Sequence, residues 1–145
     1  MSNKPVLSIA IPTYNRVSFL EKLLDNILPQ AQKANGTVEV CISNNGSSDN
    51  TREIVKFFQN KYPGIIKYNE NKENLGINRN ILKIMDMAEG DFVWLLGDDD
   101  IVVNNGVERV ITFIQNFCKV NIGLITLGHE AYFFDSKTQK KNSLF

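Results

Sequence analysis

Short, β-branched apolar runs alternate along this chain with longer segments in which apolar residues recur at helical spacing. The runs are typical of buried strands and predict strands over residues 6–11, 38–43, 65–68, 92–96 and 122–127. The first strand is expected to lie centrally in a sheet. Strands that alternate with helices in this way predict an α/β fold with a doubly wound, mostly parallel sheet.

The segments between the strands predict helices. Pro29 is expected to kink or end the first. Asn50, with Glu53 three residues on, offers a capping box for the second. The third is expected to stop at Gly90, and the last covers roughly residues 105–118. The predicted inward faces are Leu20, Leu23, Leu24, Ile27, Leu28 and Ala31 in the first helix, and Ile77, Ile81, Ile84, Met85 and Ala88 in the third.

Composition narrows the class of protein. With 145 residues the chain fits a single domain over residues 1–145, and its polar segment 136–142 is expected to be an exposed loop or frayed end. Lys and Arg balance Asp and Glu at 16 each, so no nucleic-acid partner is expected. The longest apolar run is far shorter than the ~18 residues of a membrane-spanning helix, and the start does not resemble a secretion signal. The chain is therefore predicted to be cytoplasmic, either free or at the inner face of the membrane.

Polar clusters follow the first, second and fourth predicted strands. Because ligands of open α/β sheets bind beyond the carboxyl ends of the strands, all of these clusters are expected at one edge of the sheet. They read Pro12-Thr13-Tyr14-Asn15-Arg16, Asn44-Asn45-Gly46-Ser47-Ser48-Asp49 and Gly97-Asp98-Asp99-Asp100.

The acidic cluster is the strongest chemical signal. Adjacent carboxylates raise one another's pKa unless a cation neutralises them. Mg²⁺ or Mn²⁺ suits such oxygens, and these ions take their remaining ligands from substrate phosphates and water, as in a nucleotide diphosphate site. An isolated Asp triplet is more often a solvated turn before a helix, but its place after a strand and beside two polar loops favours the metal site. Neither a Gly-x-Gly-x-x-Gly motif nor a phosphate loop is present, so phosphate binding falls to the metal and to Arg or Lys.

In this order, the clusters resemble the family 2 glycosyltransferases of the GT-A fold. These have a strand plus Pro-Thr-Tyr-Asn-Arg, a strand plus a variant of Asp-Asp-Gly-Ser-x-Asp-x-Thr, and then an Asp-x-Asp element. The resemblance covers about residues 6–103, and residues 74–80 are similar to the family's Asn-x-Gly stretch before an Arg-Asn helix start. It implies a Rossmann-like GT-A sheet with helices on both faces, of which this chain would be the C-terminally truncated, nucleotide-sugar-binding part.

The resemblance also implies a role for each cluster. Asp98 would approach ribose or phosphate, Asp99 would be the leading metal ligand with Asp100 assisting, and Arg79 would contact phosphate. The residues implied to line the pocket for the base and ribose, or to lie beside it, are Pro12, Thr13, Tyr14, Asn15 and Arg16.

The second cluster departs from the family pattern. Asn44 and Asn45 stand where the family often has acidic residues, the second of which accepts the uracil N3 proton. An Asn carbonyl can accept that bond too, but as a neutral one of about half the strength of a charge-assisted bond. Uridine remains the favoured base, with thymidine and guanosine open.

The resemblance implies transfer of a sugar, with inversion, from a nucleotide-sugar donor to a saccharide acceptor. The catalytic base is expected beyond Phe145. The alternatives are a noncatalytic nucleotide-sugar-binding module and a metal-dependent phosphoryl or nucleotidyl transferase. Leu144 and Phe145 are apolar and would pack on a second half or on a partner chain, so self-association is a further expectation.

Overall fold

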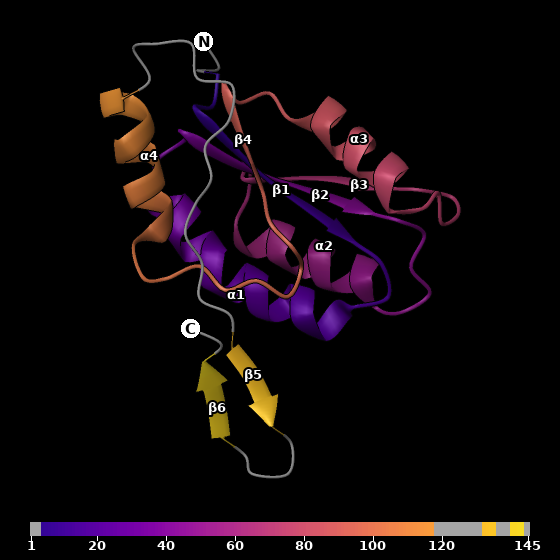
Figure 1. Cartoon of the computed structure of the whole chain (residues 1–145). Helices are drawn as coiled ribbons and strands as arrows, with labels where there is room; N and C mark the ends of the chain where they lie inside the picture. Colours follow the sequence, from indigo (N-terminus) through magenta and orange to yellow (C-terminus); the bar gives the residue numbers. More distant parts are fainter. Residues whose placement is uncertain (1–3, 118–131, 136–139, 144–145) are drawn as a thin grey trace.

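The computed structural model describes residues 4–117, 132–135 and 140–143. The main sheet contains β1 (Leu7–Thr13), β2 (Val38–Asn44), β3 (Ile66–Glu70) and β4 (Phe92–Leu95), in the order β3-β2-β1-β4 (Figure 1). Every pairing in this sheet is parallel. β1 lies inside the sheet, as its apolar run predicts.

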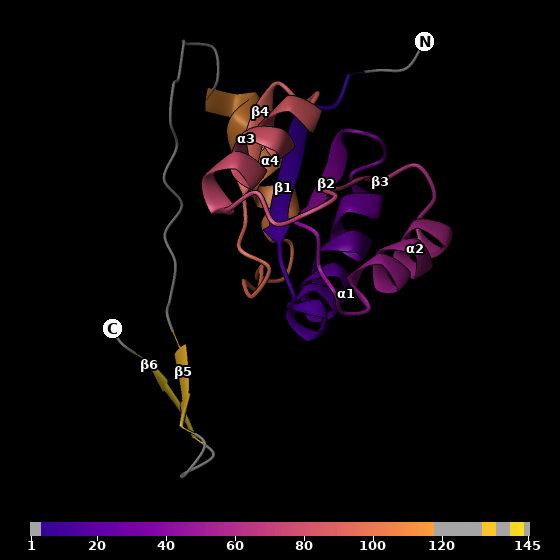
Figure 2. The ribbon, with the colours of Figure 1, turned by 90° about the vertical axis from the view of Figure 1, so that its right-hand side faces the viewer.

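Helices cover both faces of this sheet (Figure 2). One face packs against α1 (Val17–Lys33), α2 (Thr51–Lys61) and α4 (Gly106–Phe117), and inward residues of β1 such as Ile9 belong to that core. On the other face, Ile84 of α3 (Ile77–Met87) packs against Ala10 and Cys41. The predicted α/β fold with helices on both faces is therefore confirmed.

Three helical details differ from the expectations. The first helix continues through Pro29 to Lys33, so of the two expected effects of the proline, a kink or an end, the end is wrong. Pro29 has no N–H to donate to the carbonyl of Asp25, which is an exposed residue. The capping box is wrong, because Asn50 makes no side-chain cap bond at the start of α2. In α3, Ile77 is 61% exposed instead of buried.

The face of α3 is displaced from the predicted one by a polar residue. Met85 is also exposed, at 37%, whereas Asn80 and Ile84 are buried against the sheet. The amide of Asn80 bonds to β2, and this fixes the face of the helix that turns inward. In α1, by contrast, all the predicted inward residues are buried.

The fourth strand lies at the edge of the described sheet, which the prediction of a buried strand missed. Val93 and Leu95 are 41% and 44% exposed.

A separate antiparallel pair contains β5 (Tyr132–Asp135) and β6 (Lys140–Ser143), where a polar loop was expected over part of the segment. The strand predicted at 122–127 lies outside the described residues. Among the helices the structure describes, each is too short or too polar to cross a membrane.

Candidate functional site

The polar clusters meet at the carboxyl edge of the sheet, as the sequence predicts. β1 and β2 are in register to their ends, where Thr13 pairs with Asn44, and β4 runs beside β1. The buried hydroxyl of Thr13 donates a hydrogen bond to Asp98 Oδ2 over 2.8 Å. The loops that follow the first and fourth strands are thus joined by a buried side-chain contact.

Arg16 adds a cation to the acidic cluster. Its Nη1 lies 3.1 Å from Asp98 Oδ1 and its Nη2 donates to Asp99 Oδ2 over 2.7 Å. The guanidinium also lies over the ring of Phe19, 4.8 Å from the centroid. Asp98 is 4% exposed, and burial raises its pKa despite the Thr13 hydrogen bond and the Arg16 charge. The guanidinium therefore bridges one buried and one half-exposed carboxylate.

The acidic turn is shaped to hold its carboxylates close to the backbone. Asp100 Oδ2 accepts the Gly97 N–H over 2.7 Å. A Cβ at Gly97 would lie 3.0 Å from Asp99 Oδ1 and 3.3 Å from Asp100 Oδ2. The glycine thus leaves the space into which both carboxylates fold.

The donor set fits a hard divalent cation. Carboxylate oxygens are the ligands that Mg²⁺ and Mn²⁺ prefer, and a cationic guanidinium already lies between Asp98 and Asp99. Within the described part of the chain, no three acidic, His or Cys side chains form a ready metal-binding group. Asp99 and Asp100 would hold a metal here, with the remaining ligands coming from phosphate and water.

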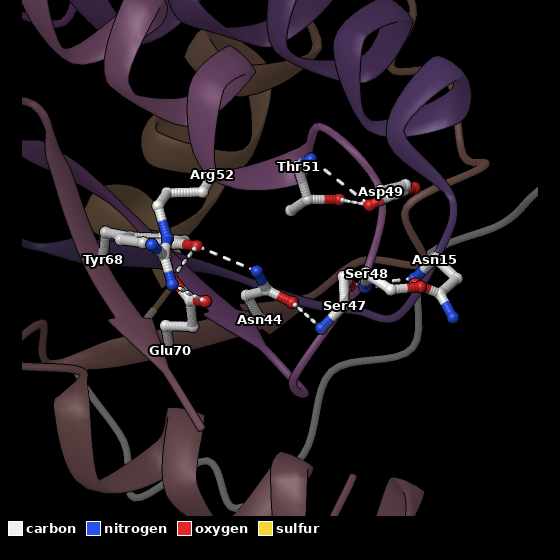
Figure 3. A network of polar contacts seen from close by, with 9 residues as sticks. All are labelled: Asn15, Asn44, Ser47, Ser48, Asp49, Thr51, Arg52, Tyr68 and Glu70. Atoms are coloured by element: carbon white, nitrogen blue, oxygen red, sulfur yellow. Dashed lines mark hydrogen bonds and ion pairs between the residues drawn. The ribbon is translucent and has the colours of Figure 1, made fainter. Parts of the chain in front are cut away.

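The loops after β1 and β2 are joined by short polar side chains (Figure 3). Asn15 has a φ of 52°, a left-handed conformation that Asn tolerates. Its N–H donates to Ser47 Oγ over 2.9 Å, and its Oδ1 accepts the Ser48 N–H over 2.8 Å. Asn15 therefore fixes the entry into α1 against the second loop.

Asp49 replaces the expected capping box. Its Oδ2 accepts the Val17 N–H over 2.9 Å at the start of α1. Its Oδ1 accepts the Thr51 hydroxyl over 2.6 Å at the start of α2 (Figure 3). Burial alone would raise the pKa of Asp49, but the hydrogen bonds from Thr51 and Val17 outweigh it and lower the pKa. One carboxylate thus stabilises the positive ends of two helices.

Asn44 is held inside a second network (Figure 3). It is 1% exposed, donates through Nδ2 to the Tyr68 hydroxyl and accepts the Ser47 N–H at Oδ1. The Tyr68 hydroxyl in turn donates to Glu70, whose carboxylate also accepts hydrogen bonds from Arg52 Nε and Nη2. Burial first, and then the Glu70 charge, raise the pKa of Tyr68 to about 12, so the hydroxyl remains a donor.

Asn45 faces the loop that precedes α3. Its Oδ1 accepts hydrogen bonds from Asn71 Nδ2 over 3.0 Å and from the Leu75 N–H over 2.9 Å, and its Nδ2 donates to Asn74 Oδ1. At 3% exposed, it is held by the protein on both ends of the amide. A ligand that bonds to the Asn45 oxygen would have to replace one of these donors.

Asn80 connects the same region to the sheet. Its Oδ1 accepts bonds from the Ser43 hydroxyl over 2.7 Å and from Asn71 Nδ2 over 2.9 Å, and its Nδ2 donates to the Ser43 carbonyl. All of these groups are buried and satisfied. The network fixes the first turn of α3, which carries Arg79.

The remaining predicted site residues lie around these networks. Tyr14 is 42% exposed, and Pro12 is half-buried at the end of β1. Arg79 is exposed in the first turn of α3 and makes no ion pair with any residue of the described chain. The structure therefore brings Thr13, Arg16 and the acidic turn into direct contact, and leaves Arg79 outside that set of contacts.

Sequence reasoning missed several residues that shape the site. Asp49 was part of a named cluster without an assigned role. Its hydrogen bond to Val17 at the start of α1 joins residues 32 positions apart in the sequence. The Asn71, Asn80 and Tyr68 contacts likewise join distant segments. Only the placement of these polar residues next to predicted strand ends and helix starts could have pointed to them.

Comparison with known proteins identifies the family. The Glycosyl transferase family 2 model matches residues 8–143. Abequosyltransferase RfbV of Salmonella typhimurium is 39% identical over 111 residues, which are 77% of this chain and 33% of the relative. The GalNAc(5)-diNAcBac-PP-undecaprenol beta-1,3-glucosyltransferase of Campylobacter jejuni is 36% identical over 109 residues, covering 74% and 34%. The chain thus spans about one third of the length of these relatives.

Solved structures agree with this family. S. aureus TarS 1-349 in complex with UDP superposes with a TM-score of 0.68 at 25% identity, covering 75% of this chain and 32% of that one. Mannosyltransferase PcManGT from Pyrobaculum calidifontis, in complex with GDP-Man and Mn²⁺, superposes with a TM-score of 0.69 at 21% identity, covering 79% and 33%. The second likeness concerns the fold alone. Because the family model matches nearly the whole chain and the named relatives are glycosyltransferases, this chain belongs to glycosyl transferase family 2.

Proposed function

We propose that this chain is the donor-binding part of an inverting glycosyltransferase that takes a nucleoside diphosphate sugar, with uridine as the favoured base. One observation carries the proposal. The acidic turn after β4 contacts Thr13 and Arg16 of the loop after β1 at the carboxyl edge of a parallel sheet, where open α/β sheets bind ligands.

The diphosphate would lie over the acidic turn. Two anionic partners, the protein carboxylates and the diphosphate, repel each other unless a cation lies between them. Asp99 and Asp100 would hold Mn²⁺ or Mg²⁺ there, and the bound metal would stabilise negative charge on the leaving diphosphate. Arg79, exposed at the start of α3, would add a phosphate contact.

The base and ribose would lie between the first two loops, against Pro12, Thr13 and Tyr14. Asn45 is the residue we propose to read the base edge. Because its oxygen already accepts bonds from Asn71 and Leu75, the base would replace one of these donors. The contact would be a neutral hydrogen bond, so discrimination among uridine, thymidine and guanosine would be modest.

The reaction would be a direct displacement at the anomeric carbon of the sugar. A hydroxyl of a saccharide acceptor would attack while a carboxylate base removes its proton. This catalytic base is proposed to lie beyond Phe145, since the chain covers one third of the length of its relatives. The relative named GalNAc(5)-diNAcBac-PP-undecaprenol beta-1,3-glucosyltransferase supports a saccharide acceptor by its name.

Calorimetry tests this proposal. UDP, TDP and GDP are titrated into the chain with Mn²⁺ or with a chelator, and measurable affinity is expected only with the metal. Asp99→Asn is expected to weaken this metal-dependent affinity. Asp91→Asn, its matched control, is expected to leave it unchanged, because Asp91 is also a half-exposed aspartate paired with a cation, Lys4, but at the opposite end of β4. Equal affinity with metal and with chelator would reject metal-assisted binding.

A further inference from the structure

The Arg16 guanidinium contacts carboxylates of the acidic cluster for which a bound metal would compete. One guanidinium contacts Asp98 over 3.1 Å and Asp99 over 2.7 Å. Among the described residues, no other Lys or Arg forms an ion pair with either aspartate. The carboxylates therefore have a cationic partner before any ligand arrives.

The two ends of this bridge differ in environment. The Asp98 side chain is 5% exposed, so the bond to it lies in a poorly solvated place and is hard to replace with water. The Asp99 side chain is 48% exposed, so that bond can be exchanged at small cost. The guanidinium also lies over the ring of Phe19, a contact that involves neither carboxylate. The geometry allows Arg16 to keep Asp98 and exchange Asp99.

We propose that Arg16 is a built-in counter-ion that makes the acidic turn bind metal and diphosphate together and bind metal alone only weakly. A bare metal ion on Asp99 competes with Nη2 for the negative charge of the carboxylate and lies close to the guanidinium charge, which repels it. A diphosphate reduces this repulsion, because it gives the guanidinium an additional anionic partner that suits the planar fork of Arg. This inference rests on the proposed donor site.

The test measures free Mn²⁺ by electron paramagnetic resonance during titration of the 145-residue chain, with and without saturating UDP. The decisive quantity is the coupling, the ratio of the Mn²⁺ dissociation constants without and with UDP. For Arg16→Gln, we expect Mn²⁺ alone to bind roughly tenfold tighter and the coupling to fall by about tenfold or more, as expected when a partly exposed charge is removed beside a cation site.

Two further variants keep the result interpretable. Arg16→Lys retains the positive charge and is expected to leave the affinity for Mn²⁺ alone within about threefold of the wild type, while coupling falls because an ammonium lacks the fork. Arg52→Gln removes a different Arg–carboxylate pair, the one with Glu70, and is expected to leave the affinity for Mn²⁺ alone unchanged. Thermal unfolding confirms that each variant is folded.

The outcomes separate this inference from the proposed function. A wild type that binds UDP only with Mn²⁺, together with an Arg16→Gln variant of unchanged or weaker affinity for Mn²⁺ alone, would overturn the inference alone. A wild type without Mn²⁺-dependent UDP binding would instead overturn the proposed donor site. Tighter binding of Mn²⁺ alone with unchanged coupling would also overturn the counter-ion role, since it would show that Arg16 does not respond to the diphosphate.

Discussion

Gly46 lies directly against the backbone of the loop that follows β3, and we expect Gly46→Ala to destabilise the fold strongly. Its φ is +73°, and a Cβ there would lie 2.7 Å from the Glu73 carbonyl carbon and 2.9 Å from its Cα. The left-handed conformation alone costs about 1 kcal/mol for alanine. Overpacking against backbone adds about 1–3 kcal/mol. The expected loss in free energy of unfolding is therefore about 2–4 kcal/mol.

A matched variant isolates the steric part of this loss. Gly64 has a φ of +80°, but a Cβ there meets nothing within 4 Å, so Gly64→Ala should cost only about 1 kcal/mol. Effects of alanine on the unfolded chain are similar in both variants and cancel in the difference. Urea unfolding measures both values. Equal losses would refute the claim that the loops after β2 and β3 are held in contact at Gly46.

Four other results are expected. Asp99→Asn should weaken Mn²⁺-dependent UDP binding without a large fall in the melting temperature of the free protein, because its half-exposed ion pair is worth at most about 1 kcal/mol; a large fall would indicate a structural role instead. Asn45→Ala should narrow the preference among UDP, TDP and GDP more than it lowers diphosphate affinity, and unchanged selectivity in competition would reject base reading by Asn45. Because the folded-state pKa of Asp49 is lowered, its stabilising effect is complete above the unfolded pKa of about 3.9 and is lost as pH falls through the folded value. Asp49→Asn should therefore reduce the loss of stability at acidic pH in a curve of unfolding free energy against pH. An unchanged loss would contradict the role of Asp49 at the starts of both helices. With labelled nucleotide sugars, residues 1–145 should show binding and at most slow hydrolysis, whereas acceptor-dependent transfer would require a base within this chain.

The order of elements could be predicted from sequence because apolar periodicity reports burial directly. The face of α1 is the clearest case, since Leu20, Leu24 and Ile27 recur at helical spacing and all are buried. The face of α3 could not be predicted in this way. Asn80 is buried there because Ser43 and Asn71 satisfy its amide, and a hydrophobic pattern contains no information about such partners.

The site was predictable to the level of clusters but not of contacts. Strand ends placed Thr13, Arg16 and Asp98 at one edge, because parallel strands align their carboxyl ends. Arg16 pairs with Asp98 and Asp99, which lie 82 or more positions away in the sequence. This pairing depends on the direction that a long side chain takes, which the sequence does not reveal. Likewise, the Asn50 and Glu53 pattern satisfied a local rule, but Asp49, supported by its tertiary contact with Val17, caps α2 instead.

The most direct test of the central claim is the location of Mn²⁺ in the UDP complex. Paramagnetic broadening of backbone amide signals, measured by nuclear magnetic resonance with UDP and substoichiometric Mn²⁺, reports which residues lie near the ion. The account predicts the strongest broadening at Gly97 to Asp100, with weaker broadening at Thr13 and Arg16. Broadening confined to another part of the chain, or broadening of equal strength with and without UDP, would contradict a joint metal and diphosphate site at the carboxyl edge of the sheet.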